Sequence, residues 1–152
     1  MKKLLTHFFV LICTFSLCTS MIGAAGAVND NINTVTPNRA SDYLTYYDAW
    51  ASTGAKREVI ISCDVIATGY MDLIGSTYIV VQEKNGSSWT GVATYFGSVA
   101  NGLLAADTDE HAGNITYVGT SGKQYRARVT VYAGDSTGDD SRTVITNTIT
   151  AR

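Results

Sequence analysis

The stretch Lys56–Ala67, KREVIISCDVIA, decides the fold. Its odd-numbered positions from Val59 to Ala67 are all apolar, whereas most of its even-numbered positions are polar. Because successive side chains of a β-strand point to opposite faces, this alternation predicts a strand with one face in a core and the other largely in water. The run Tyr125–Ala133 repeats the pattern and predicts a second strand of the same kind.

Further short runs of β-branched and aromatic residues are separated by turn residues, as in a sandwich or barrel. Between two of them, the stretch 84–87 contains Asn-Gly, a strong hairpin signal. The predicted strands are Asp42–Ser52, Lys56–Ala67, Thr77–Glu83, Trp89–Phe96, Asn114–Val118, Tyr125–Ala133 and Thr143–Ala151. Seven strands without helical periodicity predict an all-β chain, a seven-stranded antiparallel sandwich of immunoglobulin-like or fibronectin-III-like type.

Three residues are expected to serve the sandwich itself. Tyr125 opens the sixth predicted strand after a glycine-bearing turn, which is the place of the tyrosine corner, whose hydroxyl bonds to upstream backbone. The alternative is that Tyr125 is one more buried aromatic residue. Cys63 points towards the predicted core, and we also expect a structural role for Trp89. The Cys–Trp–Cys framework of antibody domains is absent, so the fibronectin-III-like comparison is the better one.

The first 40 residues are expected to lie outside this domain. Lys2 and Lys3 precede a mostly apolar stretch, and Ala25-Gly26-Ala27 fits the small-x-small rule of signal peptidase. This predicts a signal peptide over residues 1–27, cleaved near Ala27, a flexible leader over 28–40 and the sandwich domain over 41–152.

A membrane anchor and a lipoprotein signal are the alternatives to a removable signal. The apolar stretch of about 15 residues is shorter than the ~20 residues needed to cross a bilayer. Neither Cys13 nor Cys18 follows the small residue that lipidation requires. We therefore expect a secreted, extracellular protein.

Charge and cysteine content exclude several classes of partner. After cleavage the chain has 9 basic and 13 acidic side chains, a net charge of −4. A mildly acidic domain without a basic stripe predicts no nucleic-acid partner and, after signal cleavage, no membrane partner. Only Cys63 remains, so the mature chain has no internal disulfide and must rely on packing.

Four elements of the chain resemble a known family. They are Ala67–Gly75 (ATGYMDLIG), Ser87-Ser88-Trp89, His111-Ala112-Gly113 and Tyr125-Arg126-Ala127. In this order and spacing, the chain resembles a family of small secreted proteins from Gram-positive bacteria that is described only as a domain of unknown function. The resemblance covers roughly residues 40–151. It implies a secreted, single-domain protein and assigns no activity and no functional residues.

One acidic stretch is a candidate metal site. In Gly134–Asp140, GDSTGDD, the carboxylates of Asp135, Asp139 and Asp140 offer the oxygen ligands that calcium favours. Asp and Gly are also ordinary turn residues, and the spacing is not that of an EF-hand. His111, the one histidine left after cleavage, has no second histidine or accessible cysteine to complete a metal site, which favours a structural role.

The aromatic residues are the candidate ligand-binding surface. Exposed aromatic rings stack on sugars or anchor protein interfaces. The alternative is that tyrosine is simply a favoured residue on half-exposed strands. The residues proposed for this surface are Tyr46, Tyr47, Trp50, Tyr78 and Tyr132.

The side-chain inventory predicts a protein without enzymatic activity and without a cofactor. No serine, cysteine or threonine lies in a recognisable nucleophile–base motif. We expect a secreted binding or interaction module whose partner is an extracellular protein or a glycan. One alternative is a carbohydrate-binding module at the cell wall or on a polysaccharide. Another is a structural surface protein that associates with itself through an exposed edge strand.

Overall fold

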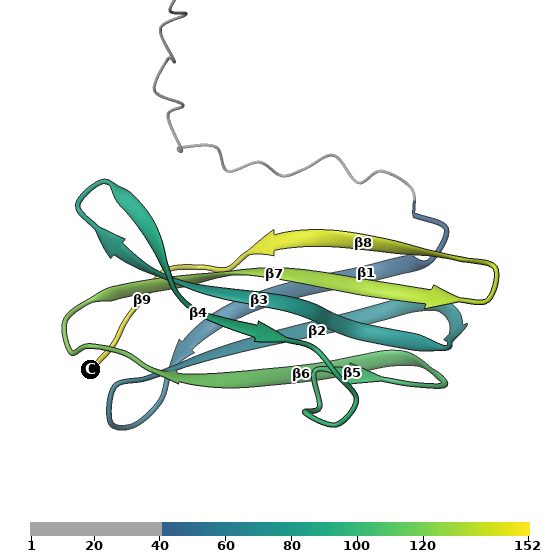
Figure 1. The fold of residues 1–152 in the computed structure, drawn as a ribbon, viewed down its shortest axis with the longest axis horizontal. Coiled ribbons are helices and arrows are strands. Elements are labelled where there is room, and N and C mark those ends of the chain that lie inside the picture. The colour runs from purple at the N-terminus through teal and green to yellow at the C-terminus, as the bar shows by residue number, and fades with distance from the viewer. Residues whose placement is uncertain (1–40) are drawn as a thin grey trace, which may run out of the picture. The chain divides into compact units, whose positions relative to one another are not determined.

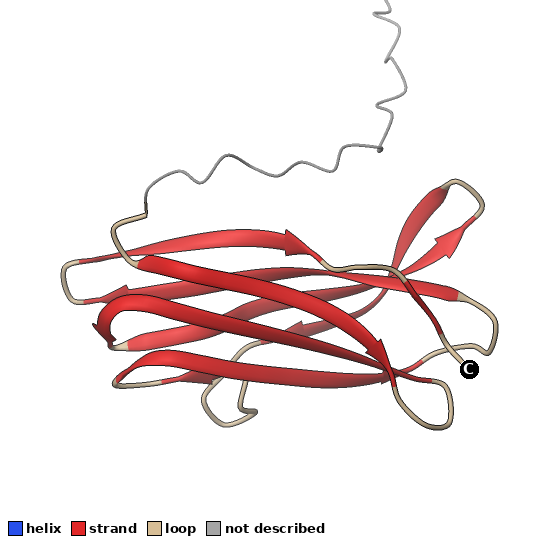
Figure 2. Ribbon diagram, turned by 180° about the vertical axis from the view of Figure 1, so that it is seen from behind, coloured by secondary structure: helices blue, strands red, loops and turns tan. Residues whose placement is uncertain are grey.

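The computed structural model describes residues 41–152, which contain strands, turns and loops and no helix (Figures 1 and 2). The predicted signal peptide over 1–27 and leader over 28–40 lie outside the described residues. Within residues 41–152, no helix offers an apolar stretch long enough to cross a membrane. The strands are β1 (Leu44–Thr53), β2 (Glu58–Met71), β3 (Leu73–Asn85), β4 (Ser88–Phe96), β5 (Leu104–Ala105), β6 (Thr108–Val118), β7 (Gln124–Asp135), β8 (Gly138–Ile145) and β9 (Ile149–Thr150).

The strands form two antiparallel sheets. The first sheet has the order β1-β2-β6, and the second has the order β4-β3-β7-β8, with the two-residue strands β5 on β3 and β9 on β7. In residues 41–152 there are thus seven long strands, which confirms the predicted β-sandwich. In a constant-type immunoglobulin domain the fourth strand joins the sheet of the first two. Here β4 pairs with β3 in the other sheet, as the fibronectin-III-like alternative requires.

The predicted bounds of several strands were wrong. The last long strand is Gly138–Ile145, not Thr143–Ala151, and the predicted loop Gly134–Asp140 is a tight hairpin. Its turn is closed by Asp135, whose Oδ1 accepts hydrogen bonds from the Thr137 N–H at 2.7 Å and the Thr137 hydroxyl at 2.6 Å. Strand β6 begins six residues before the prediction, because the polar residues from Thr108 onward pair through their backbone with β2.

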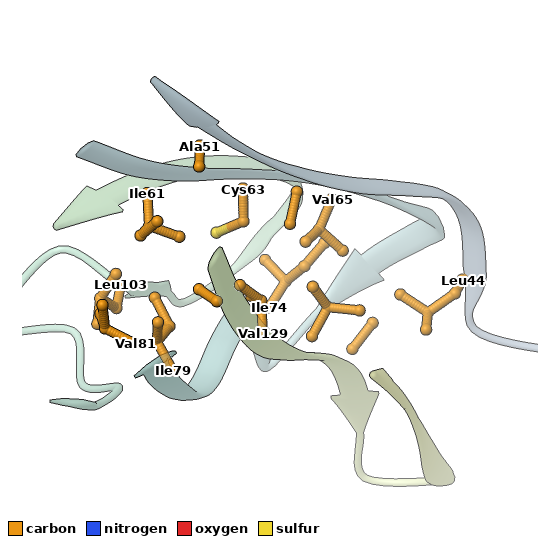
Figure 3. Packing of buried hydrophobic residues seen from close by; sticks show 14 of the residues in the cluster. Leu44, Ala51, Ile61, Cys63, Val65, Ile74, Ile79, Val81, Leu103 and Val129 are labelled. Atoms are coloured by element: carbon orange, nitrogen blue, oxygen red, sulfur yellow. The ribbon is translucent and has the colours of Figure 1, made fainter. Parts of the chain in front are cut away.

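A single apolar layer fills the space between the sheets (Figure 3). Val59, Ile61 and Val65 of β2 are fully buried, as are Val129 and Val131 of β7. This confirms the phase predicted for both strands. Cys63 lies in the same layer, where its thiol donates to the Gly113 carbonyl at 3.6 Å, and burial raises the pKa of the Cys63 thiol.

Tyr125 forms the predicted tyrosine corner. Its ring is buried, and its hydroxyl accepts a hydrogen bond from the backbone N–H of Thr120, five residues upstream, at 2.8 Å. The same hydroxyl donates to the Glu83 carboxylate at 2.6 Å, and Lys123 lies 3.5 Å from that carboxylate. A Cβ at Gly119 would lie 2.7 Å from the Tyr125 ring, so this turn needs glycine for the ring to pack against it. The corner ties the β6–β7 turn to β3.

The segment after β8 joins the two sheets along one side. The Thr146 hydroxyl accepts from the Ala127 N–H of β7 at 2.9 Å. The Asn147 amide then bonds to β1, accepting from the Ala51 N–H at 2.8 Å and donating to the Ala51 carbonyl at 2.9 Å. The Asn147 side chain thus takes the place of a neighbouring strand and covers part of the free edge of β1, a common protection against edge pairing.

The inward-facing positions of β7 lead to a prediction for the effect of a buried charge. Val129→Asp should unfold the domain at room temperature or cost about 3–5 kcal/mol, because an unpaired carboxylate in the apolar layer is not compensated. Arg128→Asp, at the adjacent exposed position, is the matched control and should melt close to the wild type. Thermal denaturation followed by circular dichroism measures both. An unchanged melting temperature for Val129→Asp would show that β7 is wrongly phased.

The tyrosine corner predicts a stability change that depends on pH. Burial, and then the bond to Glu83, raises the pKa of Tyr125 above its ordinary value of about 10. The unfolded chain therefore ionises first, so the corner's contribution is complete below about pH 10 and is lost as the pH rises from there through the higher pKa of the folded chain. Tyr125→Phe should cost about 1–3 kcal/mol at neutral pH, because the bonds to Thr120 and Glu83 are lost.

Urea denaturation between pH 8 and pH 11 tests this expectation. Because phenylalanine does not ionise, Tyr125→Phe should lose less stability than the wild type over the alkaline part of that range. Tyr70→Phe is the control, since Tyr70 is 77% exposed, and it should follow the wild type. Equal alkaline losses in the wild type and Tyr125→Phe would contradict the assigned role of the hydroxyl.

Candidate functional site

The five aromatic residues predicted to bind a ligand do not form one patch. Tyr46 and Trp50 lie on the outer face of the first sheet. Tyr78 and Tyr132 lie on the outer face of the second sheet, on the opposite side of the sandwich. Tyr47 faces the interior and packs against the core. Including Tyr47 with Tyr46 was wrong, because adjacent residues of a strand face opposite sides. The other four residues are divided because their strands belong to different sheets.

The outer face of the first sheet carries aromatic rings and carboxylates. Strands β1, β2 and β6 contain no lysine or arginine. The cross-strand register aligns the outward side chains in rows across the sheet. The surface is called the acidic face below and consists of Tyr46, Asp48, Trp50, Glu58, Ser62, Asp64, Ile66, Glu110 and Asn114.

Two exposed rings stand on one strand of the acidic face. Tyr46 is 46% exposed and Trp50 is 42% exposed. They are four residues apart on β1, which corresponds to about 13 Å along a strand. Between them, Asp48 lies directly opposite Asp64 of β2. Ser62 of β2 lies opposite Trp50, and Asn114 of β6 follows Ser62 in the same row across the sheet. Flat rings with carboxylate and other polar groups near them can stack on a ligand and accept its hydrogen bonds.

The outer face of the second sheet also carries exposed aromatic and aliphatic side chains, but its charges are mainly positive. The surface is called the basic face below and consists of Tyr78, Val80, Lys84, Trp89, Phe96, Arg126, Arg128, Thr130, Tyr132, Thr143 and Ile145. Asp139, at the β7–β8 hairpin, is the one carboxylate on the outward positions of the strands that form this face.

Contacts with neighbouring side chains hold several aromatic rings of the basic face in place. The rings of Tyr78 and Phe96 lie 5.3 Å apart at 53°, and Phe96 is 71% exposed. Trp89, predicted to be structural, has the Arg126 guanidinium 4.3 Å from its ring centroid, and Arg126 also donates to Gln82 at 2.9 Å. Trp89 lies near the tip of the β3–β4 hairpin, which projects from the sandwich (Figure 1). These contacts fix the rings on the surface.

The predicted calcium ligands are not brought together. Asp135 closes the hairpin turn, and its hydrogen bonds to Thr137 lower the pKa of its carboxyl. Asp139 accepts from the Tyr132 hydroxyl at 3.3 Å, and Asp140 pairs with Arg142. Asp139 and Asp140 are neighbours in β8, so their side chains point to opposite faces. Among residues 41–152, no group of three or more acidic, histidine or cysteine side chains could hold a metal ion.

His111 has a structural contact within β6. Its Nε2 lies 3.0 Å from the Gly102 carbonyl, which tethers the segment before β5. Gly75 has a φ of +131° and faces the Leu103 backbone on the same segment, so a side chain there would collide with it. The histidine and this glycine together hold the segment against the sandwich.

Several residues of these surfaces were missed from the sequence. Phe96 closes the predicted fourth strand, yet it was not included among the surface aromatics. The pattern Tyr46, Asp48, Trp50 at alternate positions of a predicted strand was a usable signal for a shared face. The opposition of Asp48 and Asp64 needed the strand register, which the sequence does not supply.

Comparisons of the chain with family models, with characterised proteins and with solved structures found no match. The resemblance to a secreted family of unknown function therefore stays a prediction. The chemistry of the two faces has to be argued from this chain alone.

The opposed carboxylates predict a stabilising substitution. Like charges directly opposite in a sheet are destabilising, so Asp64→Asn should raise the free energy of unfolding by about 0.2–1 kcal/mol. The gain should shrink in 1 M NaCl, where the screening length is about 3 Å.

Urea denaturation at low and high salt measures this gain. Asp42→Asn, in the exposed turn before β1, is the control and should change stability little. If Asp64→Asn is no more stable than Asp42→Asn at low salt, the two carboxylates do not repel each other.

Proposed function

We propose that the mature protein is a secreted, non-enzymatic binding module that recognises its partner through the outer faces of its sheets. The observation that carries the proposal is the gathering of exposed rings and aliphatic side chains on the outer faces of the sheets. Contiguous apolar groups on a soluble domain, bordered by polar side chains, are typical of interaction surfaces. The extracellular location rests on the sequence of residues 1–27.

The acidic face is the leading candidate surface. Trp50 and Tyr46 are rigid side chains with large contact areas, the type that dominates binding energy at interfaces. The sheet that presents them has carboxylates and no lysine or arginine in its strands. Such a surface favours a partner with a basic surface or a ligand rich in hydrogen-bond donors.

A carbohydrate is the second candidate partner. The specific observation in its favour is the position of the Asp48–Asp64 row between the rows of the two rings, with Asn114 two strands from Trp50 in the same row. The apolar face of a sugar ring can stack on an aromatic side chain while its hydroxyl groups donate to the carboxylates. The spacing of about 13 Å along β1 allows both rings to contact one short oligosaccharide.

Association through an exposed strand edge has weaker support. Asn147 covers part of the β1 edge through its bonds to Ala51. Strand β4, at one edge of the second sheet, has an irregular register opposite Val81 and Gln82, a feature that discourages further pairing. The faces therefore offer a better surface for a partner than these two edges.

Co-sedimentation with purified bacterial cell walls tests the carbohydrate candidate on the mature chain, residues 28–152. Binding should be lost in Tyr46→Ala/Trp50→Ala and kept in Tyr78→Ala/Phe96→Ala, the matched pair on the other face. Both double variants should melt within a few degrees of the wild type, because all four side chains point outward.

The outcomes separate the candidates. Loss of binding only in the Tyr46/Trp50 variant supports carbohydrate recognition by the acidic face. No binding by the wild type at micromolar concentration removes the carbohydrate candidate and leaves a protein partner. Binding that survives in the Tyr46/Trp50 variant removes the acidic face as the recognition surface.

A further inference from the structure

The two outer faces of this one domain carry opposite charges. Outward positions of the first sheet hold four carboxylates and no cation: Asp48, Glu58, Asp64 and Glu110. Outward positions of the second sheet hold Lys84, Arg126 and Arg128, and Asp139 is confined to one end. Both faces also present exposed apolar side chains, so each combines an apolar surface with charge of a single dominant sign.

Arg128 and Asp64, near the centres of the basic and acidic faces, belong to neither ion pair found within the described residues. The ion pairs in residues 41–152 join Lys123 to Glu83 and Arg142 to Asp140. Arg128 is exposed on the basic face, where its row also contains Val80 and Ile145. Asp64 lies on the central strand of the acidic face, opposite another carboxylate. Each face therefore presents charge that a complementary surface can neutralise.

We propose that each face binds a second copy of this chain, so that the acidic face of one copy packs on the basic face of the next. This inference rests on the proposed function, because it names the partner of the same surfaces. Complementary charge favours the acidic-on-basic contact, and like charge disfavours the symmetric pairings of two acidic or two basic faces. A cation from the basic face would also relieve the repulsion between Asp48 and Asp64.

The arrangement of the sheets fixes the type of assembly. The two faces lie on opposite sides of one sandwich, so a copy that uses its acidic face still offers its basic face. Such a head-to-tail contact does not close by two-fold symmetry and generates rings or open stacks. Asn147 covers part of the β1 edge, which disfavours growth by strand pairing along that edge.

Paired charge reversals on the mature chain test the inference by sedimentation velocity over a range of concentrations. The wild type should show assembly that grows with concentration and weakens with added NaCl. The acidic-face variant Asp48→Lys/Asp64→Lys and the basic-face variant Lys84→Glu/Arg128→Glu should each associate at least about tenfold more weakly. An equimolar mixture of the two variants should regain assembly, because each supplies the complement of the other's reversed face.

Two controls keep the result specific to the faces. Asp42→Lys/Asp72→Lys changes the net charge as much as the acidic-face variant does, but both residues lie in exposed turns, and it should assemble at least as well as the wild type. Thermal melts confirm that each variant is folded. If a lysine or glutamate pair unfolds the domain, Asp48→Asn/Asp64→Asn and Lys84→Gln/Arg128→Gln replace it, and each should still weaken assembly.

Three results would overturn the inference. The first is a wild type that stays monomeric at every concentration, and the second is assembly that persists in both charge variants. The third is a mixture of the two charge-reversal variants, both folded, that does not recover assembly. If the wild type is monomeric but binds cell walls through Tyr46 and Trp50, the proposed function stands and self-association alone is removed.

Discussion

The packing of β2 against β7 is the constraint on which the rest of the structure depends. Ile61 and Val65 meet Val129 and its neighbours in one apolar layer, and within residues 41–152 no disulfide joins the sheets. Because side chains alternate along a strand, burying the odd positions of β2 and β7 sends their even positions outward. The constraint that builds the core therefore also decides which residues can meet a partner. The Tyr125 hydroxyl and the Asn147 amide then hold the strands in place at two points of the sandwich.

The sequence predicted the features that alternation or local geometry determines. The interior positions of β2 and β7 and the corner at Tyr125 follow from side-chain period and from a glycine-bearing turn. Alternation does not reveal which sheet a strand joins, so the division of Tyr46 from Tyr78 could not be predicted. The polar start of β6 and the start of β8 could not be predicted from the side-chain pattern. These segments are strands because their backbone pairs with a neighbouring strand. The signal peptide and the leader over residues 1–40 stay predictions.

Both candidate partners would bind the acidic face. A glycan stacked on Tyr46 and Trp50 and a second copy packed over Asp48 and Asp64 would occupy the same surface. The glycan and the second copy would therefore compete, and a saturating concentration of glycan would dissociate the assembly. The like-charged pair on this face is costly for an isolated domain, and such a cost at an exposed position is typical of residues kept for binding. On the basic face, by comparison, the Arg126 guanidinium contacts the Trp89 ring and donates to Gln82.

Hydroxyl-radical footprinting of the mature chain at low and high concentration tests most directly whether the two faces are recognition surfaces for each other. Trp50 on the acidic face and Phe96 on the basic face should both lose reactivity as concentration rises. Tyr70, 77% exposed near the end of β2 and outside the residues that define either face, should keep its reactivity. Protection of both faces together, reversed by salt, is the predicted result. Unchanged reactivity of both rings, or protection of Tyr70 alone, would contradict the account.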